Sequence, residues 1–286
     1  MKDDAVTTAY CIASLIVSWS LQYSALDIVG DPQSASAVPW LLVTMATPGL
    51  LAIAFLVAWP ATRHNVLWKP NWRFVYVAPI AVLVPTAIAF ATLTAAAVAG
   101  WGGSKWFDFA LSGVQITGGP WVLGQGVQGW PLFTSNVIIT GSFFALLNAI
   151  PALGEELGWR GFLQTRLIER FGVLKGITML GLIWSAWHLP AQAAGYNFPD
   201  SPLIGSFVLS PIELVFTSYF LAWLTIRSGS FIAAAVAHGA GNSIQEGVIA
   251  SLHLTVSPMH VHLLRVMITV IVGVLCLALL LPTRRH

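Results

Sequence analysis

The chain has 286 residues, of which 57% are hydrophobic and only 8% are charged, and its mean hydropathy is +0.79. A soluble globular domain carries about 25% charged residues, so this composition excludes an ordinary soluble protein and indicates an integral membrane protein. The formal net charge is +2. Because the basic residues follow the loops between apolar segments and form no single basic face, we expect no nucleic-acid partner.

Eight apolar segments are long enough to cross a bilayer, for which a helix needs about 20 residues. In chain order they cover approximately residues 5–26, 38–60, 74–100, 132–154, 173–190, 203–226, 230–250 and 261–282. We therefore predict an all-α fold, a polytopic membrane helical bundle of about eight transmembrane helices, as a single integral membrane domain over residues 1–286. Asp3 and Asp4 directly follow Lys2, which is not typical of a cleaved signal peptide, so the first segment is expected to remain as a span.

The distribution of Lys and Arg predicts the orientation, because short cytoplasmic loops carry an excess of both. With the N-terminus inside, eleven basic residues lie on the inner side: Lys2, Arg63, Lys69, Arg73, Arg160, Arg166, Arg170, Lys175, Arg227, Arg284 and Arg285. On the outer side lie Lys105 and Arg265. The sequence thus predicts a multi-pass protein of the cell membrane with both termini in the cytoplasm.

Two segments differ from the spans around them. The stretch 101–131 is rich in Gly and contains four tryptophans, which are typical of the aromatic belt at a membrane interface. The segment 155–170 mixes apolar and charged residues with helical periodicity. We expect it to continue the fourth span into the cytoplasm and to turn at Phe171 and Gly172 into the fifth span.

Several charged and polar residues fall close to the expected membrane depth, where a charge needs a partner, a water-filled cavity or a function. Glu155 and His188 are almost equally far from the turn at 171–172, so an antiparallel helical hairpin places them opposite each other. Glu156 and Arg160 have the i,i+4 spacing of an ion pair. In the segment 230–250, His238 and Asn242 are four residues apart and share one helical face.

Three short motifs occur in order on separate predicted helices. "EELGWR" (155–160) has the pattern Glu-Glu-x-x-x-Arg, and "HGAGN" (238–242) has the pattern His-x-x-x-Asn. "WSAWH" (184–188) has the spacing of Phe-x-x-x-His, with Trp184 in the place of Phe. Together they resemble the CPBP family of CAAX proteases and bacteriocin-processing enzymes, which are intramembrane endopeptidases with an eight-helix core. The resemblance covers a motif-bearing core at about residues 132–250.

The resemblance implies a glutamate-dependent hydrolytic site without a metal or other cofactor. Glu155 and His188 would activate a water molecule, and His238 and Asn242 would stabilise the tetrahedral oxyanion. Supporting roles would fall to Glu156, Arg160 and Trp184, the last in the wall of the pocket. The implied partners are the lipid bilayer and a membrane-associated peptide or lipidated protein as substrate.

Other interpretations remain open at this stage. Two Glu and two His could bind zinc, which needs three or four ligands at short range, although no H-E-x-x-H motif occurs. A transporter or bacteriocin-immunity protein without enzymatic activity could use the same polar cavity, since intramembrane carboxylates and histidines also form proton relays. The sequence shows no repeated halves of the kind that many transporters have. Glu246 is expected near the cavity mouth, and Glu213 receives no role.

Overall fold

The computed structural model describes residues 2–60, 63 and 66–281, so the predicted cytoplasmic residues Arg284 and Arg285 lie outside the described part, as does the side chain of Lys2. The chain divides into two compact units. Unit 1 comprises Met1–Phe74, Pro151–Ala235 and Thr269–His286, and unit 2 comprises Val75–Ile150 and Val236–Ile268.

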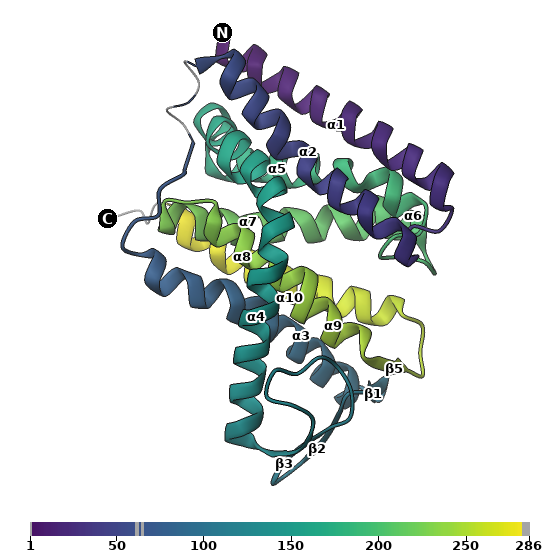
Figure 1. Cartoon of the computed structure of the whole chain (residues 1–286). Coiled ribbons are helices and arrows are strands. Elements are labelled where there is room, and N and C mark those ends of the chain that lie inside the picture. The colour runs from purple at the N-terminus through teal and green to yellow at the C-terminus, as the bar shows by residue number, and fades with distance from the viewer. Residues whose placement is uncertain (1, 61–62, 64–65, 282–286) are drawn as a thin grey trace. The chain divides into compact units, whose positions relative to one another are not determined.

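The regular elements of unit 1 in its described residues are all helices, and α1 runs beside α2 (Figure 1). Its complete elements are α1 (Lys2–Val29), the short 3-10 helix η1 (Ala35–Ala37), α2 (Val38–Ala58), the π-helix η3 (Leu157–Leu163), α5 (Gln164–Ala193), α6 (Pro202–Ile204), the π-helix η4 (Gly205–Leu209) and α7 (Ser210–Ser228). Three helices are shared with unit 2 by more than one residue: α4 (Trp130–Glu156) contributes its last residues to unit 1, α8 (Ile232–Ala240) its first, and α10 (Met259–Leu280) its last.

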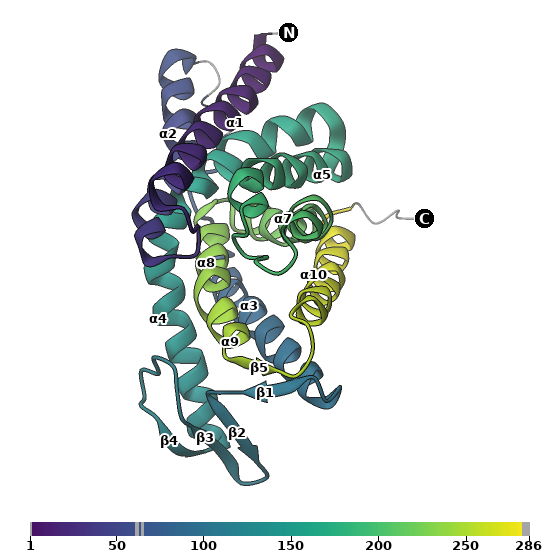
Figure 2. The same cartoon turned by 90° about the vertical axis from the view of Figure 1, so that its right-hand side faces the viewer.

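Unit 2 combines helices with two small antiparallel sheets. Its other helices are α3 (Phe74–Val98), the π-helix η5 (Gly241–Gln245) and α9 (Glu246–Ala250). The strands β2 (Phe107–Ala110), β3 (Gly113–Ile116) and β4 (Gly126–Gly129) form one sheet in that order, and β1 (Gly102–Ser104) pairs with β5 (Leu252–Leu254) in the other (Figure 2).

The predicted polytopic membrane helical bundle is confirmed. By length and composition, six helices in the described residues could cross a membrane: Asp4–Val29, Ala35–Ala58, Phe74–Val98, Trp130–Ala193, Pro202–Ser228 and Met259–Leu280. The 64-residue stretch Trp130–Ala193 contains two of the predicted spans. The predicted span 230–250 corresponds to α8, η5 and α9, whose polar residues lower its hydropathy, so the count of eight stays a prediction.

The small sheets are a difference from the predicted all-α fold. Each strand has only three or four residues, too few for a two-residue periodicity to be recognised in the sequence. The aromatic residues of this region pack on one another, with the ring centroids of Phe107 and Trp121 5.2 Å apart and those of Trp106 and Trp121 6.3 Å apart. Phe107 and Trp121 are buried, so a hydrophobic cluster in unit 2 accounts for part of the tryptophan content.

The predicted turn between the fourth and fifth spans is confirmed at Gly172. Its dihedral angles, φ 77° and ψ 169°, interrupt the helical conformation within α5, and positive φ costs glycine little because it has no Cβ. The chain therefore folds back on itself, and residues 155–171 and 173–193 form the two legs of a helical hairpin (Figure 2).

The first leg packs against α1 and α2 at close range. A Cβ atom on Gly158 would lie 2.4 Å from the hydroxyl oxygen of Tyr10 and 2.6 Å from the carbonyl carbon of Pro48. The Tyr10 hydroxyl also donates a hydrogen bond of 2.9 Å to the carbonyl oxygen of Pro48. No side chain fits at position 158 unless the backbone of α2 moves.

The substitution Gly158→Ala is therefore expected to lower the free energy of unfolding by about 1–3 kcal/mol, the usual cost of overpacking a core. Thermal or denaturant unfolding in detergent measures this loss. Gly241→Ala is the matched control, because a Cβ atom at Gly241 would meet nothing within 4 Å. Equal stability of Gly158→Ala and the control would contradict the close packing.

Candidate functional site

Glu155 and Glu156 end α4 and are almost completely buried, with 1% and 0% of their surfaces exposed. The indole nitrogen of Trp184 donates a hydrogen bond of 2.8 Å to Oε2 of Glu155. Glu155 lies on the first leg of the hairpin and Trp184 on the second, so this bond joins the two legs. The hairpin was predicted to place Glu155 opposite His188. The hydrogen bond supports this arrangement at Trp184, one helical turn before His188.

His188 is half-buried and its ring packs against aromatic neighbours on the same helix. Its Nδ1 lies 2.9 Å from the carbonyl oxygen of Trp184. A carbonyl oxygen only accepts hydrogen bonds, so Nδ1 is the nitrogen that carries the proton in this arrangement. In the neutral ring, the lone pair then resides on Nε2, the nitrogen suited to accept a proton.

Arg160 connects Glu156 with the aromatic ring that holds Glu155. Its Nη1 lies 3.1 Å from Oε1 of Glu156, and its Nη2 donates to the hydroxyl of Ser218 at 3.0 Å. The guanidinium carbon lies 4.3 Å from the centroid of the Trp184 ring. The predicted i,i+4 pair is confirmed, and both of its side chains are fully buried.

Of the three π-helical segments in the described part of the chain, two coincide with motifs. The π-helix η3 starts directly after Glu156 and contains Arg160, and η5 contains Asn242. Single π-turns inside helices are rare and frequently occur at functional sites, because the widened turn re-aims its side chains. The sequence gives no signal for these turns, since residues with ordinary helical patterns occupy them.

The remaining motif residues lie in unit 2. His238 is half-buried near the end of α8, and Asn242 is exposed in η5. The π-helix η5 begins at Gly241, between these two residues, which were predicted to share one helical face. The structure brings Glu155, Glu156, Arg160, Trp184 and His188 together within unit 1. That His238 and Asn242 converge on this group stays a prediction.

Glu246, which was expected near a cavity mouth, forms an ion pair with Arg265. Its Oε1 lies 2.7 Å from Nη1 of Arg265, which is 5% exposed. His253 lies in β5 opposite Gly103, and the His260 ring packs on Trp101 with 5.2 Å between centroids. Among residues 2–60, 63 and 66–281, no group of three or more His, Cys, Asp or Glu could hold a metal ion.

Unit 2 contains a cavity of about 230 Å³. One of its wall residues, Ser243, directly follows Asn242 in the sequence. The walls of the cavity are formed by Trp106, Pro120, Trp121, Thr140, Phe144, Asn148, Ser243, Ile244 and Gly247. The polar side chains in this wall bond to their own unit: Ser243 donates to the carbonyl of Gly239 and Asn148 to that of Phe144. The cavity therefore offers aromatic and aliphatic surface.

Known proteins show similarity in the motif-bearing region. Residues 138–244 match the family described as type II CAAX prenyl endopeptidase Rce1-like, a range that contains all three motifs. CAAX prenyl protease 2 of Methanococcus maripaludis is 24% identical over 192 residues, which are 63% of this chain and 60% of the relative. Both matches support the predicted resemblance to the CPBP family. The chain covers only about 60% of that relative's length.

The structure adds two features that the motifs did not predict. Ser218, on α7, bonds to Arg160 although no motif includes it. Trp184, which was predicted in the wall of the pocket, donates a hydrogen bond to Glu155. A Phe at this position, as in the usual family pattern, has no hydrogen to donate.

Replacing Arg160 by Met removes the cation from a fully buried pair, so Arg160→Met should lower the free energy of unfolding by about 3–5 kcal/mol. Unfolding in detergent measures the change. Arg170→Met is the matched control, because Arg170 and Asp4 also form a pair at 3.1 Å but are 47% and 49% exposed. An exposed pair contributes about 0–1 kcal/mol. Similar losses in both variants would contradict a special contribution of the buried pair.

Proposed function

We propose that this chain is an intramembrane endopeptidase that cleaves lipidated peptides by glutamate-activated attack of water. One observation carries the proposal: a carboxylate 1% exposed, Glu155, is held by the indole of Trp184, with His188 one helical turn away. A buried carboxylate with a fixed orientation and a nearby imidazole is suited to general base catalysis.

The proposed reaction begins when Glu155 takes a proton from a water molecule. Oε2 accepts the Trp184 hydrogen bond, so Oε1 is the atom that receives the water proton. The water oxygen bonds to the carbonyl carbon of the peptide, and the carbonyl oxygen becomes an oxyanion. His238 and Asn242 donate hydrogen bonds to that oxyanion, as an oxyanion hole does. The C–N bond then breaks, and the leaving amine takes the proton from Glu155.

His188 has a second role in this mechanism. With its Nδ1 proton on the Trp184 carbonyl, its Nε2 accepts a hydrogen bond from the same water molecule and fixes the direction of attack. The buried pair of Glu156 and Arg160 places positive charge behind the Trp184 ring. Both proton transfers go through Glu155, first from the water molecule and then to the leaving amine, so we propose a reaction that does not depend on a metal ion.

The cavity in unit 2 is proposed to hold the hydrocarbon group of the substrate. An apolar cavity of about 150 Å³ already binds benzene, and this one has about 230 Å³ and aromatic walls. The name of the relative, CAAX prenyl protease 2, points to a prenyl group as the hydrocarbon. Ser243 in the cavity wall directly follows Asn242 in η5, so the lipid would be bound beside a proposed oxyanion donor.

Glu155→Gln is expected to abolish cleavage of fluorogenic prenylated peptides by the detergent-purified full chain, because the amide cannot accept the proton of water. Cleavage by the wild type should continue in the presence of a metal chelator. Glu169→Gln is the matched control, since Glu169 lies on the same leg of the hairpin with an exposed side chain. Retained cleavage in folded Glu155→Gln would overturn the mechanism, and chelator-sensitive cleavage would point to a metal.

Filling the cavity tests the proposed lipid site. A Cβ atom on Gly247 would lie 3.4 Å from the ring of Trp106, so the larger side chain in Gly247→Leu enters the cavity. We expect KM for a prenylated peptide to rise at least tenfold, about the cost of a lost hydrophobic contact of one or two methylenes, while KM for an unmodified peptide stays the same. Gly103→Leu is the control, because position 103 opens on empty space. Equal effects on both peptides would reject the cavity as the lipid site.

A further inference from the structure

Helix α5 lacks one of its own hydrogen bonds near His188. Residue 190 is Pro, which has no N–H and cannot bond to the carbonyl oxygen four residues earlier. That oxygen belongs to Ala186, two residues before His188. A buried carbonyl without a partner costs free energy, so the helix needs a donor from elsewhere at this point.

Helix α1 supplies that donor. The indole nitrogen of Trp19 donates a hydrogen bond of 2.8 Å to the carbonyl oxygen of Ala186. A side chain 167 residues away thus takes the place of the amide that Pro190 lacks. The backbone of α5 is held by α1 at the turn that carries His188.

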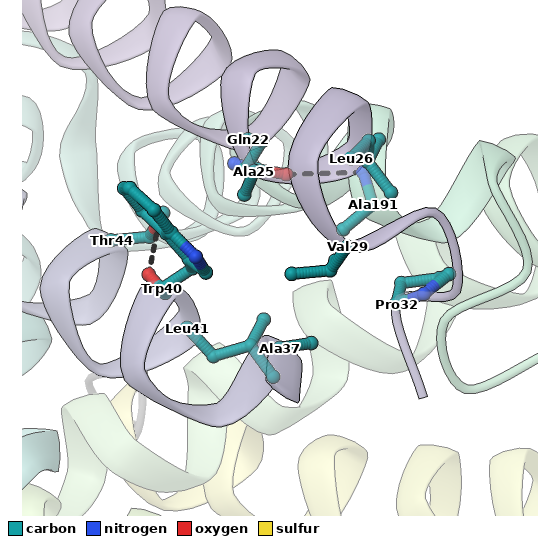
Figure 3. A pocket seen from close by; sticks show the side chains of 10 residues that line it. All are labelled: Gln22, Ala25, Leu26, Val29, Pro32, Ala37, Trp40, Leu41, Thr44 and Ala191. Carbon is teal, nitrogen blue, oxygen red and sulfur yellow. Dashed lines mark hydrogen bonds between the residues drawn. The ribbon is translucent and has the colours of Figure 1, made fainter. Parts of the chain in front are cut away.

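Gln22, one turn further along α1, makes a second contact of the same kind. Its Nε2 donates to the carbonyl oxygen of Trp187 at 2.7 Å, and its Oε1 accepts from the N–H of Ala191 at 3.1 Å. In a regular α-helix the carbonyl of residue 187 accepts a hydrogen bond from the N–H of residue 191. The side-chain amide of Gln22 therefore bonds to both backbone groups of one such pair. Figure 3 shows Gln22 reaching to Ala191 beside a cavity of about 20 Å³, roughly the space of one water molecule.

Ser18 completes the set by fixing the ring next to His188. The Trp187 indole donates to the hydroxyl of Ser18, which lies 2.7 Å from the hydroxyl of Thr47 on α2. The rings of Trp187 and His188 are nearly perpendicular, with 4.6 Å between centroids. Both the backbone and the aromatic neighbour of His188 are therefore held by one turn of α1.

From these contacts we infer that Trp19 and Gln22 are positioning residues for His188. Both lie outside the matched range 138–244, in a helix to which the motifs assign no role. They act through the α5 backbone and do not touch the substrate. The expected effect of Trp19 and Gln22 on catalysis rests on the proposed function. Their effect on the position of His188 rests only on contacts within unit 1.

The decisive experiment compares Trp19→Phe in two backgrounds. With Pro190 present, the variant leaves Ala186 without its donor, and we expect kcat for prenylated peptide to fall about 10- to 100-fold with KM unchanged, the range for a catalytic group displaced by about 1 Å. In Pro190→Ala the new backbone N–H bonds to Ala186, so adding Trp19→Phe should change kcat little. A loss of equal size in both backgrounds would overturn the inference.

Gln22→Met tests the amide bridge, because Met has a similar length and no hydrogen-bonding amide. Gln33→Met is the matched control: Gln33 also donates to a carbonyl of this segment, that of Gly195 at 2.8 Å, seven residues beyond His188. We expect the kcat loss only in Gln22→Met. Equal kcat in both variants would exclude a positioning role for Gln22.

A second readout separates this inference from the proposed function. The ring ¹⁵N signals of His188, assigned by their loss in His188→Gln, should shift in Trp19→Phe and return in Trp19→Phe/Pro190→Ala. This result would support the positioning role even if the wild type cleaved no peptide, an outcome that would reject only the endopeptidase. Unchanged His188 signals in Trp19→Phe and Gln22→Met would overturn the positioning role even in an active protease.

Discussion

The arrangement of unit 1 depends on burying two adjacent carboxylates inside an apolar helical protein. Moving an ionised carboxylate out of water costs several kcal/mol even after the protein relaxes, so each one requires an opposite charge or hydrogen-bond donors. Glu156 has the guanidinium of Arg160, and Glu155 has the indole of Trp184. Because the same guanidinium lies over the Trp184 ring, the two arrangements are parts of one cluster.

The hairpin around Gly172 makes this cluster possible, since it brings Trp184 and His188 back to the level of α4. Gly158 then lets the first leg approach α2 and Tyr10 at backbone distance. Pro190 introduces a gap in the hydrogen bonds of the second leg, and α1 fills it. The segments outside the matched family range therefore do more than cross the membrane, because the geometry around His188 depends on them.

The sequence predicted the helices, the turn at Gly172 and the pair of Glu156 and Arg160, since each follows from local patterns: long apolar runs, a glycine between two periodic segments, and i,i+4 spacing. It did not predict the strands at 102–129, because three or four residues cannot display a period. It also did not predict the π-turns in η3 and η5. A π-turn depends on the packing of neighbouring helices and on their competing hydrogen bonds. Neither produces a recognisable pattern in the residues of the turn.

Contacts between residues far apart in the sequence are a second kind of feature that could not be predicted from the sequence. A proline at position 190 removes a backbone donor, yet nothing in the sequence identifies Trp19 as the side chain that replaces it. Trp184 was visible as an aromatic substitution, and its meaning depended on where its N–H points. A Phe in that place would leave Glu155 without this donor, so the carboxylate would depend on Arg160 or on water for its partners. In this chain the aromatic position of the second motif therefore also orients the carboxylate of the first, a coupling between motifs that spacing alone does not reveal.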